Sequence, residues 1–499
     1  MDISTALSFV RAKLKELTLC NAARSALDWD METGMPPAAS ETRADVISFL
    51  AGLAHEMALD PYYVEALTFL REQVALGNVP ADETANIALA WKAYEREARL
   101  PGDFVRELSN LTAVSHHVWA EARRQSDFGM FAPNLTRIID LKREQARLLS
   151  SGSPPYDALL DEFEPGANTA AITAVLTPLR ERLAALVAKI AGAAAVAPPP
   201  LIAAPLDAQI NWNQRIAAML GFDFQAGRLD ASAHPFTAKL HLGDVRITTR
   251  YEPKDLLYSV MSTVHEAGHG MYDQGVPAAD YGQPVGEAPS LGIHESQSRL
   301  WENLVARGRP FWQYFLPLLQ ADGFLPGVDV DSFNRSVNRV QPSFIRTEAD
   351  EVTYNLHICL RFEIERDLIE GRLAVADVRD AWNAKMRELL GLEVTSDALG
   401  VLQDVHWSSG LIGYFPTYTI GNLYSAQLYA TVLREMPDLE DRIRAGDFRG
   451  LLDWLHDRVH WHGSRYGAEQ IIRRATGKGL DSSDFLAYIE RKYGEIYRF

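Results

Sequence analysis

The sequence predicts a mainly helical fold with one short β-hairpin. In residues 1–190, apolar residues recur at intervals of three and four, which is the spacing of one buried helix face. Short segments containing Pro or Gly interrupt this pattern at 35–37, 77–80, 101–102 and 152–155. The helical spacing returns between Pro253 and Gly275, and the clearest strand pattern lies in residues 239–251.

The composition is that of a globular protein with a substantial interior. Of the 499 residues, 47% are hydrophobic, and the formal net charge is −17. This acidic balance argues against nucleic acid and anionic membranes as partners. The two cysteines, Cys20 and Cys359, cannot form a disulfide framework, and they favour a reducing compartment. We therefore expect a soluble, cytoplasmic protein.

Two apolar segments bear on targeting and membrane insertion. Residues 1–17 carry three basic side chains among apolar ones, which indicates an amphipathic helix and not a signal peptide. The most apolar stretch, 183–206, is interrupted by Lys189 and by three consecutive prolines, so it cannot span a bilayer as a helix. Residues 191–205 are rich in Ala and Pro and are the best candidate for a linker.

The pentapeptide His265-Glu266-Ala267-Gly268-His269 lies inside the predicted helix between Pro253 and Gly275. Proline suits a first helical position, and glycine suits the residue just past the end. Residues four apart lie on the same helix face, so both imidazoles can reach one metal ion. Glu266 points somewhat over a quarter of a turn away and can take a proton from water beside the ion. The pattern predicts a catalytic zinc site; the alternative is an exposed helix with two solvated histidines.

A catalytic zinc needs a third protein ligand besides water. The next predicted helix, from Ser290 to about Arg307, carries His294-Glu295-Ser296-Gln297. The loop before it is long enough to let this helix fold back against the first. We predict Glu295 as the third ligand, with His294 as the competitor, because neighbouring side chains cannot both point at the ion. The alternative for Glu295 is a surface carboxylate.

The strand pattern in 239–251 predicts a hairpin of two strands, Lys239–Leu242 and Val245–Arg250. A helix is predicted before it, from about 206 to 230. Since the hairpin directly precedes the metal-site helix, an extended substrate could add to it as another strand. The alternative is a structural hairpin that caps the helical core.

Two later segments carry further candidates. A long helix is predicted from about Pro342 to Glu370, and its first turns hold several charged residues. Residues 400–422 are rich in glycine, aromatic and hydroxyl side chains, which predicts a loop bent over a site. The candidates in these two segments are Arg346, Glu348, Asp350, Asp404, His406, Tyr414 and Tyr418.

Six segments in this order resemble the thermostable carboxypeptidase family, the Taq-type metallocarboxypeptidases. They are His234-Pro235-Phe236, Asp244-Val245-Arg246-Ile247-Thr248, His265 to His269, His294 to Gln297, Ile345-Arg346-Thr347-Glu348-Ala349-Asp350, and Gly400 to Trp407. The N-terminal Leu27-Asp28-Trp29-Asp30, followed by Met35-Pro36-Pro37, is similar too. The resemblance covers nearly the whole chain.

The resemblance implies one domain over 1–499, with a helical N-terminal part (1–190) and a catalytic part (206–499). It implies a helical, saddle-shaped fold with a deep central groove and a small β-sheet beside the HExxH helix. It further implies a homodimer that removes single residues from free peptide C-termini with broad specificity, disfavours C-terminal proline, and works with zinc and often with cobalt. Family members carry metal ligands at the positions of His265, His269 and Glu295.

The expected reaction is metal-assisted hydrolysis. Glu266 accepts a proton from water and later delivers it to the leaving amine. The tetrahedral oxyanion needs a further hydrogen-bond donor besides the metal. His406 and either Tyr414 or Tyr418 are the candidates, and the sequence leaves the choice between the tyrosines open.

An exopeptidase acting at the C-terminus must also recognise a free carboxylate, which a guanidinium binds in a bidentate manner. Arg346 is the first candidate because it lies in a family segment. Arg246 and Arg250, in the predicted hairpin, are its rivals. Each of the three could instead form a structural ion pair.

Two other function classes stay open. A zinc endopeptidase, or a peptidase acting from the N-terminus, would use the same metal chemistry with a different anchor. For a substrate amine, Glu348 or Asp350 could serve as that anchor. A catalytically silent relative would act as a binding scaffold, but the intact Glu266 argues against that alternative.

Overall fold

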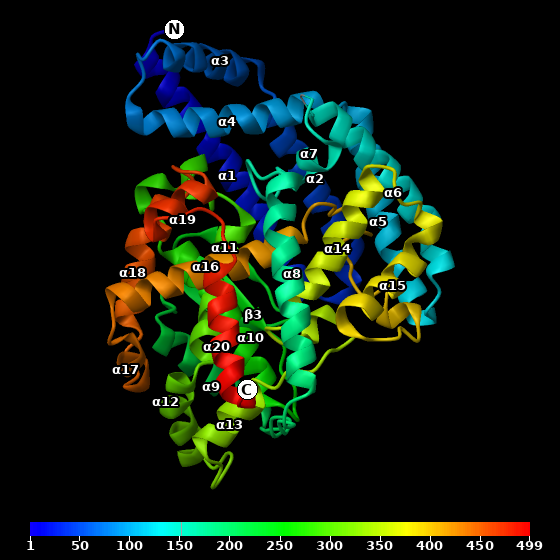
Figure 1. Ribbon diagram of the computed structural model, residues 1–499. Coiled ribbons are helices and arrows are strands. Elements are labelled where there is room, and N and C mark those ends of the chain that lie inside the picture. The colour runs from blue at the N-terminus through cyan, green and yellow to red at the C-terminus, as the bar shows by residue number, and fades with distance from the viewer. Residues whose placement is uncertain (151) are drawn as a thin grey trace. The chain divides into compact units, whose positions relative to one another are not determined.

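The computed structural model describes residues 1–150 and 152–499, and it confirms the mainly helical class (Figure 1). Contacts divide the chain into two compact units. The first unit comprises Met1–Ala98, Pro200–Asn334 and Leu428–Gly479, and the second comprises Arg99–Pro199, Arg335–Gln427 and Leu480–Phe499. One boundary falls between Pro199 and Pro200, inside the predicted linker. The division into parts 1–190 and 206–499 stays a prediction.

Most of the first unit is α-helix, joined by short turns. Its helices are α1 (Ile3–Thr33), α2 (Ser40–Ala58), α3 (Pro61–Ala75), α9 (Leu206–Leu220), α10 (Leu256–Gln274), α11 (Leu291–Arg299), α12 (Arg309–Ala321), α17 (Leu439–Arg444), α18 (Arg449–Arg458) and α19 (Ala468–Thr476). Three further helices contain a boundary between the units: α4 (Ala81–Arg99), α13 (Val330–Val337) and α16 (Pro416–Glu435).

The second unit is helical in the residues that the structure describes. Its helices are α5 (Gly102–Gln125), α6 (Phe128–Leu149), α7 (Pro155–Leu160), α8 (Thr169–Ala191), α14 (Tyr354–Ile369), α15 (Val378–Leu390) and α20 (Ser483–Tyr497). In the described part of the chain, no helix has both the length and the apolar character needed to cross a membrane.

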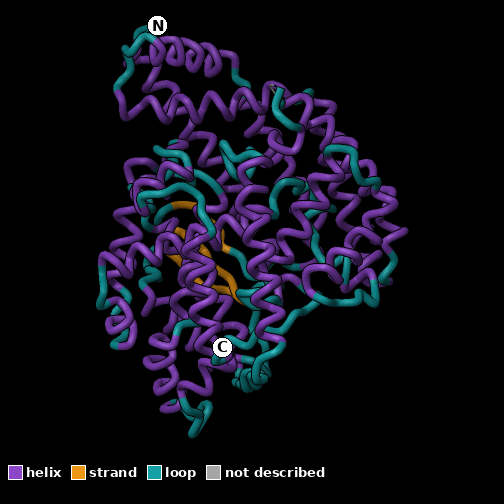
Figure 2. Tube along the Cα trace, in the orientation of Figure 1, coloured by secondary structure: helices purple, strands orange, loops and turns teal. Residues whose placement is uncertain are grey.

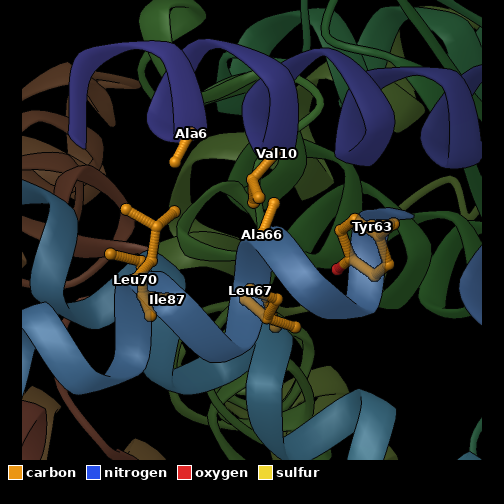
Figure 3. Close-up of a cluster of buried hydrophobic side chains, with 8 residues drawn as sticks. Ala6, Val10, Tyr63, Ala66, Leu67, Leu70 and Ile87 are labelled. Carbon is orange, nitrogen blue, oxygen red and sulfur yellow. The ribbon is translucent and has the colours of Figure 1, made fainter. Parts of the chain in front are cut away.

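The N-terminal helices α1, α3 and α4 share a small apolar core (Figure 3). Pro61 occupies the first turn of α3, and the Asp60 side chain caps it by accepting a hydrogen bond from a backbone amide. The small side chains of Ala6 and Ala66 sit among larger ones in this core. Its buried members are Ala6, Val10, Tyr63, Ala66, Leu67, Leu70, Ile87 and Ala90.

A three-stranded sheet lies in the first unit, where Figure 2 shows its strands among helices. Strands β1 (Gly227–Ala231), β2 (Thr237–His241) and β3 (Asp244–Thr249) are ordered β1-β3-β2. β2 pairs antiparallel with β3, which confirms the predicted hairpin, and β1 pairs parallel with β3. Helix α10 packs against β3 (Figure 1). The sheet therefore lies against the helix that carries the HExxH motif.

Strand β1 corrects the helix predicted to run to about residue 230. Helix α9 ends at Leu220, because Gly221 adopts a left-handed conformation with φ of 116°. Gly227 then opens β1, and a Cβ atom there would lie 2.3 Å from the Val245 carbonyl oxygen. Only glycine allows this close approach of the two strands.

The long helix predicted from Pro342 to Glu370 is wrong in its first part. α14 begins only at Tyr354, and Arg346–Glu348 forms a separate 3-10 turn. The Asp350 carboxylate accepts hydrogen bonds from three backbone amides, those of Gln341, Val352 and Thr353. Local capping by a side chain thus competes with the helix and delays its start.

The loop predicted for 400–422 is irregular as far as Phe415. Pro416 then begins α16, so the last seven residues of the predicted loop are helical. Proline suits this position because the first turn of a helix does not use its backbone N–H groups.

Candidate metal centre and peptidase site

Helix α10 places the two motif histidines on one face. Asp255 caps its N-terminus by accepting from the Leu257 amide, so the helix starts slightly later than the predicted Pro253. Gly275 follows its end, as predicted. The imidazole rings of His265 and His269 lie 5.0 Å apart. The i, i+4 spacing therefore produces the expected pair of neighbouring imidazoles.

A second helix meets α10 at its glycine. α11 begins after Ser290, whose hydroxyl accepts from the Ile293 amide. A Cβ atom on Gly268 would lie 2.7 Å from the Cα of Ser298 and 2.8 Å from the Gln297 carbonyl oxygen. The glycine inside the motif thus allows α11 to pack directly against α10, and this brings Glu295 to the histidines.

Glu295 completes a cluster of three potential metal ligands. One donor atom from each of His265, His269 and Glu295 lies within 4.8 Å of the other two. Glu295 Oε2 is 3.4 Å from His269 Nε2 and 3.8 Å from His265 Nε2. Its other oxygen, Oε1, accepts a hydrogen bond of 2.7 Å from Arg299 Nε. The structure therefore brings together the three residues predicted from the motif spacing.

The carboxylate of Glu295 is buried and charged. Burial opposes its ionisation, but Arg299 and the two imidazoles outweigh burial and hold the pKa of Glu295 well below its usual range. Glu295 therefore presents an ionised carboxylate at neutral pH.

Glu302 contacts His265 at the ring nitrogen that does not face Glu295. It lies in a π-helical turn, Leu300–Ala306, that continues α11, and its Oε2 is 2.8 Å from His265 Nδ1. Arg299 Nη1 is 3.3 Å from the same oxygen. Burial raises the pKa of Glu302, but Arg299 and His265 outweigh burial and lower it to about 2. An acceptor at Nδ1 leaves Nε2, the nitrogen that faces Glu295, free to bind a metal.

The donor set suits a divalent metal ion. Two imidazole nitrogens and one carboxylate oxygen lie within 4.8 Å of one another, and Glu302 holds the ring of His265 through Nδ1. Two histidines and a glutamate are a known catalytic zinc set, which leaves one position for water. The residues present therefore fit the metal that the motif predicts.

The sequence and structure match one family of known proteins. The family described as "Carboxypeptidase Taq (M32) metallopeptidase" matches residues 9–493. The chain belongs to this family. It is therefore a metallocarboxypeptidase, a hydrolase that acts on peptides, and the family implies a metal cofactor.

Relatives match over nearly their whole length. The chain is 40% identical to "Thermostable carboxypeptidase 1" of Thermus thermophilus over 481 residues, which cover 94% of each protein. It is 35% identical to "Carboxypeptidase 1" of Bacillus subtilis over 488 residues, which cover 97% of each. The crystal structure of an M32 carboxypeptidase from Deinococcus radiodurans R1 matches with a TM-score of 0.96 and 39% identity, covering 99% of this chain and all of that one. These names favour a carboxypeptidase over the endopeptidase and scaffold alternatives.

In this M32 carboxypeptidase, the His294 side chain contacts Asp273 and does not join the cluster of three. Its Nε2 is 3.3 Å from Asp273 Oδ1, and its ring stacks on that of His269 at 4.5 Å. The competitor for the third ligand position is thus held by Asp273, outside the cluster of three.

Glu266 lies beside the cluster and is 6% exposed. Thr237 of β2 contacts it: the Thr237 Oγ1 is 2.7 Å from Glu266 Oε2 and 3.2 Å from its backbone oxygen. Sequence reasoning missed Thr237, because nothing in the spacing links residues 29 positions apart.

The three candidate arginines all form ion pairs. Arg246 binds Asp244 through Nε and Nη2, both at 2.8 Å, and Arg250 Nε is 2.9 Å from Glu252 Oε1. These pairs are local, between residues two apart on the chain. They match the structural alternative, and binding of a substrate carboxylate by either arginine stays a prediction.

Arg346, in the second unit, is buried and bound to Asp404. Its Nε and Nη2 lie 3.0 and 2.9 Å from Asp404 Oδ1, and Nη1 donates to the Tyr354 hydroxyl at 3.0 Å. Arg361, which is fully buried, donates to the other oxygen of Asp404 from Nε and Nη2. Sequence reasoning missed Arg361, since a lone arginine inside a helix carries no signal of its own.

His406 and the two tyrosines form one aromatic cluster in the second unit. His406 Nε2 is 3.2 Å from the Tyr418 hydroxyl, and its ring centroid is 5.2 Å from that of Tyr414. Burial, with Arg346 and Arg361, lowers the pKa of His406 to about 3. The imidazole is therefore neutral at pH 7, and it can donate a hydrogen bond from only one nitrogen.

Proposed function

We propose that this M32 enzyme is a zinc-dependent carboxypeptidase. It removes single residues from the free C-termini of peptides with broad specificity, it disfavours C-terminal proline, and cobalt can replace zinc. The observation that carries the proposal is the convergence of His265, His269 and Glu295 beside Glu266. We also propose that the enzyme works in the cytoplasm as a homodimer, as the family resemblance implies.

The metal ligands in this proposal are His265, His269 and Glu295. When bound, zinc supplies Lewis acidity and lowers the pKa of its water toward neutrality. Glu302 and Arg299 keep the imidazole of His265 and the carboxylate of Glu295 in position. Three ordered side chains at the metal reduce the reorganisation needed before reaction.

Glu266 moves the proton in the proposed reaction. Its carboxylate accepts a proton from the attacking water and delivers it to the nitrogen of the leaving amino acid. The buried position of Glu266 keeps competing water away from this transfer. A Glu266→Gln variant should therefore keep its metal and lose turnover.

The remaining roles rest on the sequence. We propose His406, with Tyr414 or Tyr418, as donors to the oxyanion. For the substrate carboxylate we propose Arg346 first, with Arg246 and Arg250 as its rivals. Neutral His406 is compatible with the first role, because a neutral imidazole still carries one N–H that can donate a hydrogen bond.

The first test uses one short N-acetylated peptide in two forms, the free acid and the C-terminal amide, with zinc or cobalt supplied. Mass spectrometry follows the products over time. We expect residues to be lost stepwise from the acid alone, and a chelator should stop the reaction. Internal cleavage of both forms would contradict the carboxypeptidase and remove the need for a carboxylate-binding arginine.

Two controls make the result specific. The acid form with C-terminal proline should be cleaved more slowly than the same peptide with C-terminal alanine. Glu266→Gln, checked for metal content, should leave both peptides intact. Turnover by this variant at the wild-type rate would exclude Glu266 as the base.

A further inference from the structure

The two carboxylate oxygens of Glu266 have different surroundings. Oε2 lies 2.7 Å from the Thr237 hydroxyl. Within residues 1–150 and 152–499, this is the one hydrogen bond that the Glu266 carboxylate makes with the protein, and Oε1 makes none. In such a buried carboxylate, one oxygen is held by the protein and the other remains available to accept a proton.

The Thr237 hydroxyl has one proton and two acceptors within reach. The Glu266 backbone oxygen is at 3.2 Å, and the carboxylate Oε2 is at 2.7 Å. Hydrogen bonds to a charged acceptor are shorter and stronger than those to a neutral carbonyl. The hydroxyl therefore donates to Oε2.

The sheet holds Thr237 in place through its backbone. Thr237 pairs with Ile247 and Lys239 pairs with Val245 in the β2–β3 ladder. Alternate residues of a strand share one face, and Lys239 Nζ lies 3.8 Å from Asp273 Oδ1 on α10. Because Asp273 is two helical turns after Glu266, both contacts join the same face of β2 to the same face of α10.

We propose that Thr237 is a positioning residue for the base of this peptidase. Its hydroxyl holds Glu266 Oε2, so that Oε1 is the oxygen that takes the proton from the attacking water. Oε1 later gives this proton to the nitrogen of the leaving amine, while Thr237 keeps its own proton throughout. This role rests on the proposed function of Glu266.

The physical basis is orientation. The terminal torsion of a glutamate side chain is broad, so an unanchored carboxylate samples many directions. A small misplacement of a reacting group costs on the order of 100-fold in rate. One hydroxyl on a rigid strand removes this freedom without changing the charge of the site.

The test compares Thr237→Val, which keeps the shape and removes the hydroxyl, with Thr237→Ser, which keeps the hydroxyl. Thr249→Val is the matched control, since Thr249 lies in β3 and its hydroxyl is 3.2 Å from a backbone carbonyl, that of Ser259. We expect Thr237→Val to lower kcat about 10- to 100-fold and to leave KM within about threefold. Thr237→Ser should restore most of the rate, and Thr249→Val should keep kcat near the wild-type value.

Two further readouts separate positioning from a structural effect. Zinc affinity, measured by competition with a chelator, should be unchanged in Thr237→Val. In a Glu266→Asp background, whose shorter carboxylate no longer reaches the hydroxyl, adding Thr237→Val should cost less than about threefold.

Several outcomes would overturn the role of Thr237. They are a wild-type kcat in Thr237→Val, an equal loss in both backgrounds, or a loss explained by weaker zinc binding. A wild-type enzyme that releases no C-terminal residue would instead overturn the proposed function itself, and the role of Thr237 with it. The assay of the wild-type enzyme therefore distinguishes the two failures.

Discussion

Each of the two units holds a buried carboxylate whose pKa lies well below its usual range: Glu295 in the first and Asp404 in the second. Guanidinium groups cause much of the shift in both cases. Asp404 has both oxygens bound by arginines, Oδ1 by Arg346 and Oδ2 by Arg361. Glu295 gives only Oε1 to Arg299, while Oε2 faces two imidazole nitrogens. A low pKa is thus common to both carboxylates. What distinguishes the candidate metal centre is that one oxygen of Glu295 faces two imidazole nitrogens and not a second arginine.

The largest expected effect is that of removing the carboxylate of Glu295, the proposed third ligand. Glu295→Ala should weaken zinc binding by more than about 100-fold, beyond the loss typical of outer partners, and should abolish turnover. Metal content after dialysis and the rate with the free-acid peptide check this. Full zinc occupancy would exclude Glu295 from the ligand set and break the comparison with Asp404.

Asp404→Asn tests the other side of the comparison. It leaves two buried guanidinium groups facing one neutral amide, so it should destabilise the protein by about 3–5 kcal/mol. Zinc affinity should not change. Denaturant unfolding and chelator competition measure the two quantities, and a loss of zinc without a loss of stability would contradict the structural reading of Asp404.

Glu302→Gln should have a smaller effect on the metal. Its amide can still accept one hydrogen bond, but it loses the charge that pairs with Arg299 and His265. We expect zinc affinity to fall about 10- to 100-fold. Glu287→Gln is a control, because Glu287 is exposed and pairs with Lys239, outside the cluster of three. Equal zinc affinity in the two variants would contradict the role of Glu302 in orienting His265.

The histidine pair of the candidate metal centre was predictable because its geometry is local. Two histidines four apart on one helix need no tertiary information, and Glu295 follows on the next helix. The same holds for the β2–β3 hairpin, whose strands are joined by only two residues, Leu242 and Gly243. Whether these residues act as ligands stays a prediction.

Two of the missed features depend on contacts distant in sequence. Thr237 meets Glu266 only because β2 packs on α10, and Arg361 meets Asp404 only through tertiary packing. The late start of α14 reflects a side chain, Asp350, that competes for backbone amides. This competition is local, but the spacing of apolar residues does not reveal it.

A third buried carboxylate, Glu365 of α14, sharpens the comparison. It accepts hydrogen bonds from three neutral donors: Trp407 Nε1 at 2.8 Å, the Gly413 amide at 2.9 Å and the Tyr156 hydroxyl at 2.8 Å. Without a guanidinium in contact, burial prevails over these donors and over the field of Arg361, and it raises the pKa of Glu365 to about 7.

The raised pKa of Glu365 predicts a definite sign for stability. Between pH 4.5 and about 7 the folded protein holds a proton that the unfolded chain has released. The contribution of Glu365 to the free energy of unfolding is thus complete below pH 4.5, is lost as pH rises to about 7, and is constant above that. Glu365→Gln has no such proton. The Tm of the variant minus the Tm of the wild type should therefore rise by about 2–4 °C from pH 5 to pH 8. Glu363→Gln, on the same helix but paired with Arg180, is the control, and a Tm difference independent of pH would show that Glu365 is charged like Glu295 and Asp404.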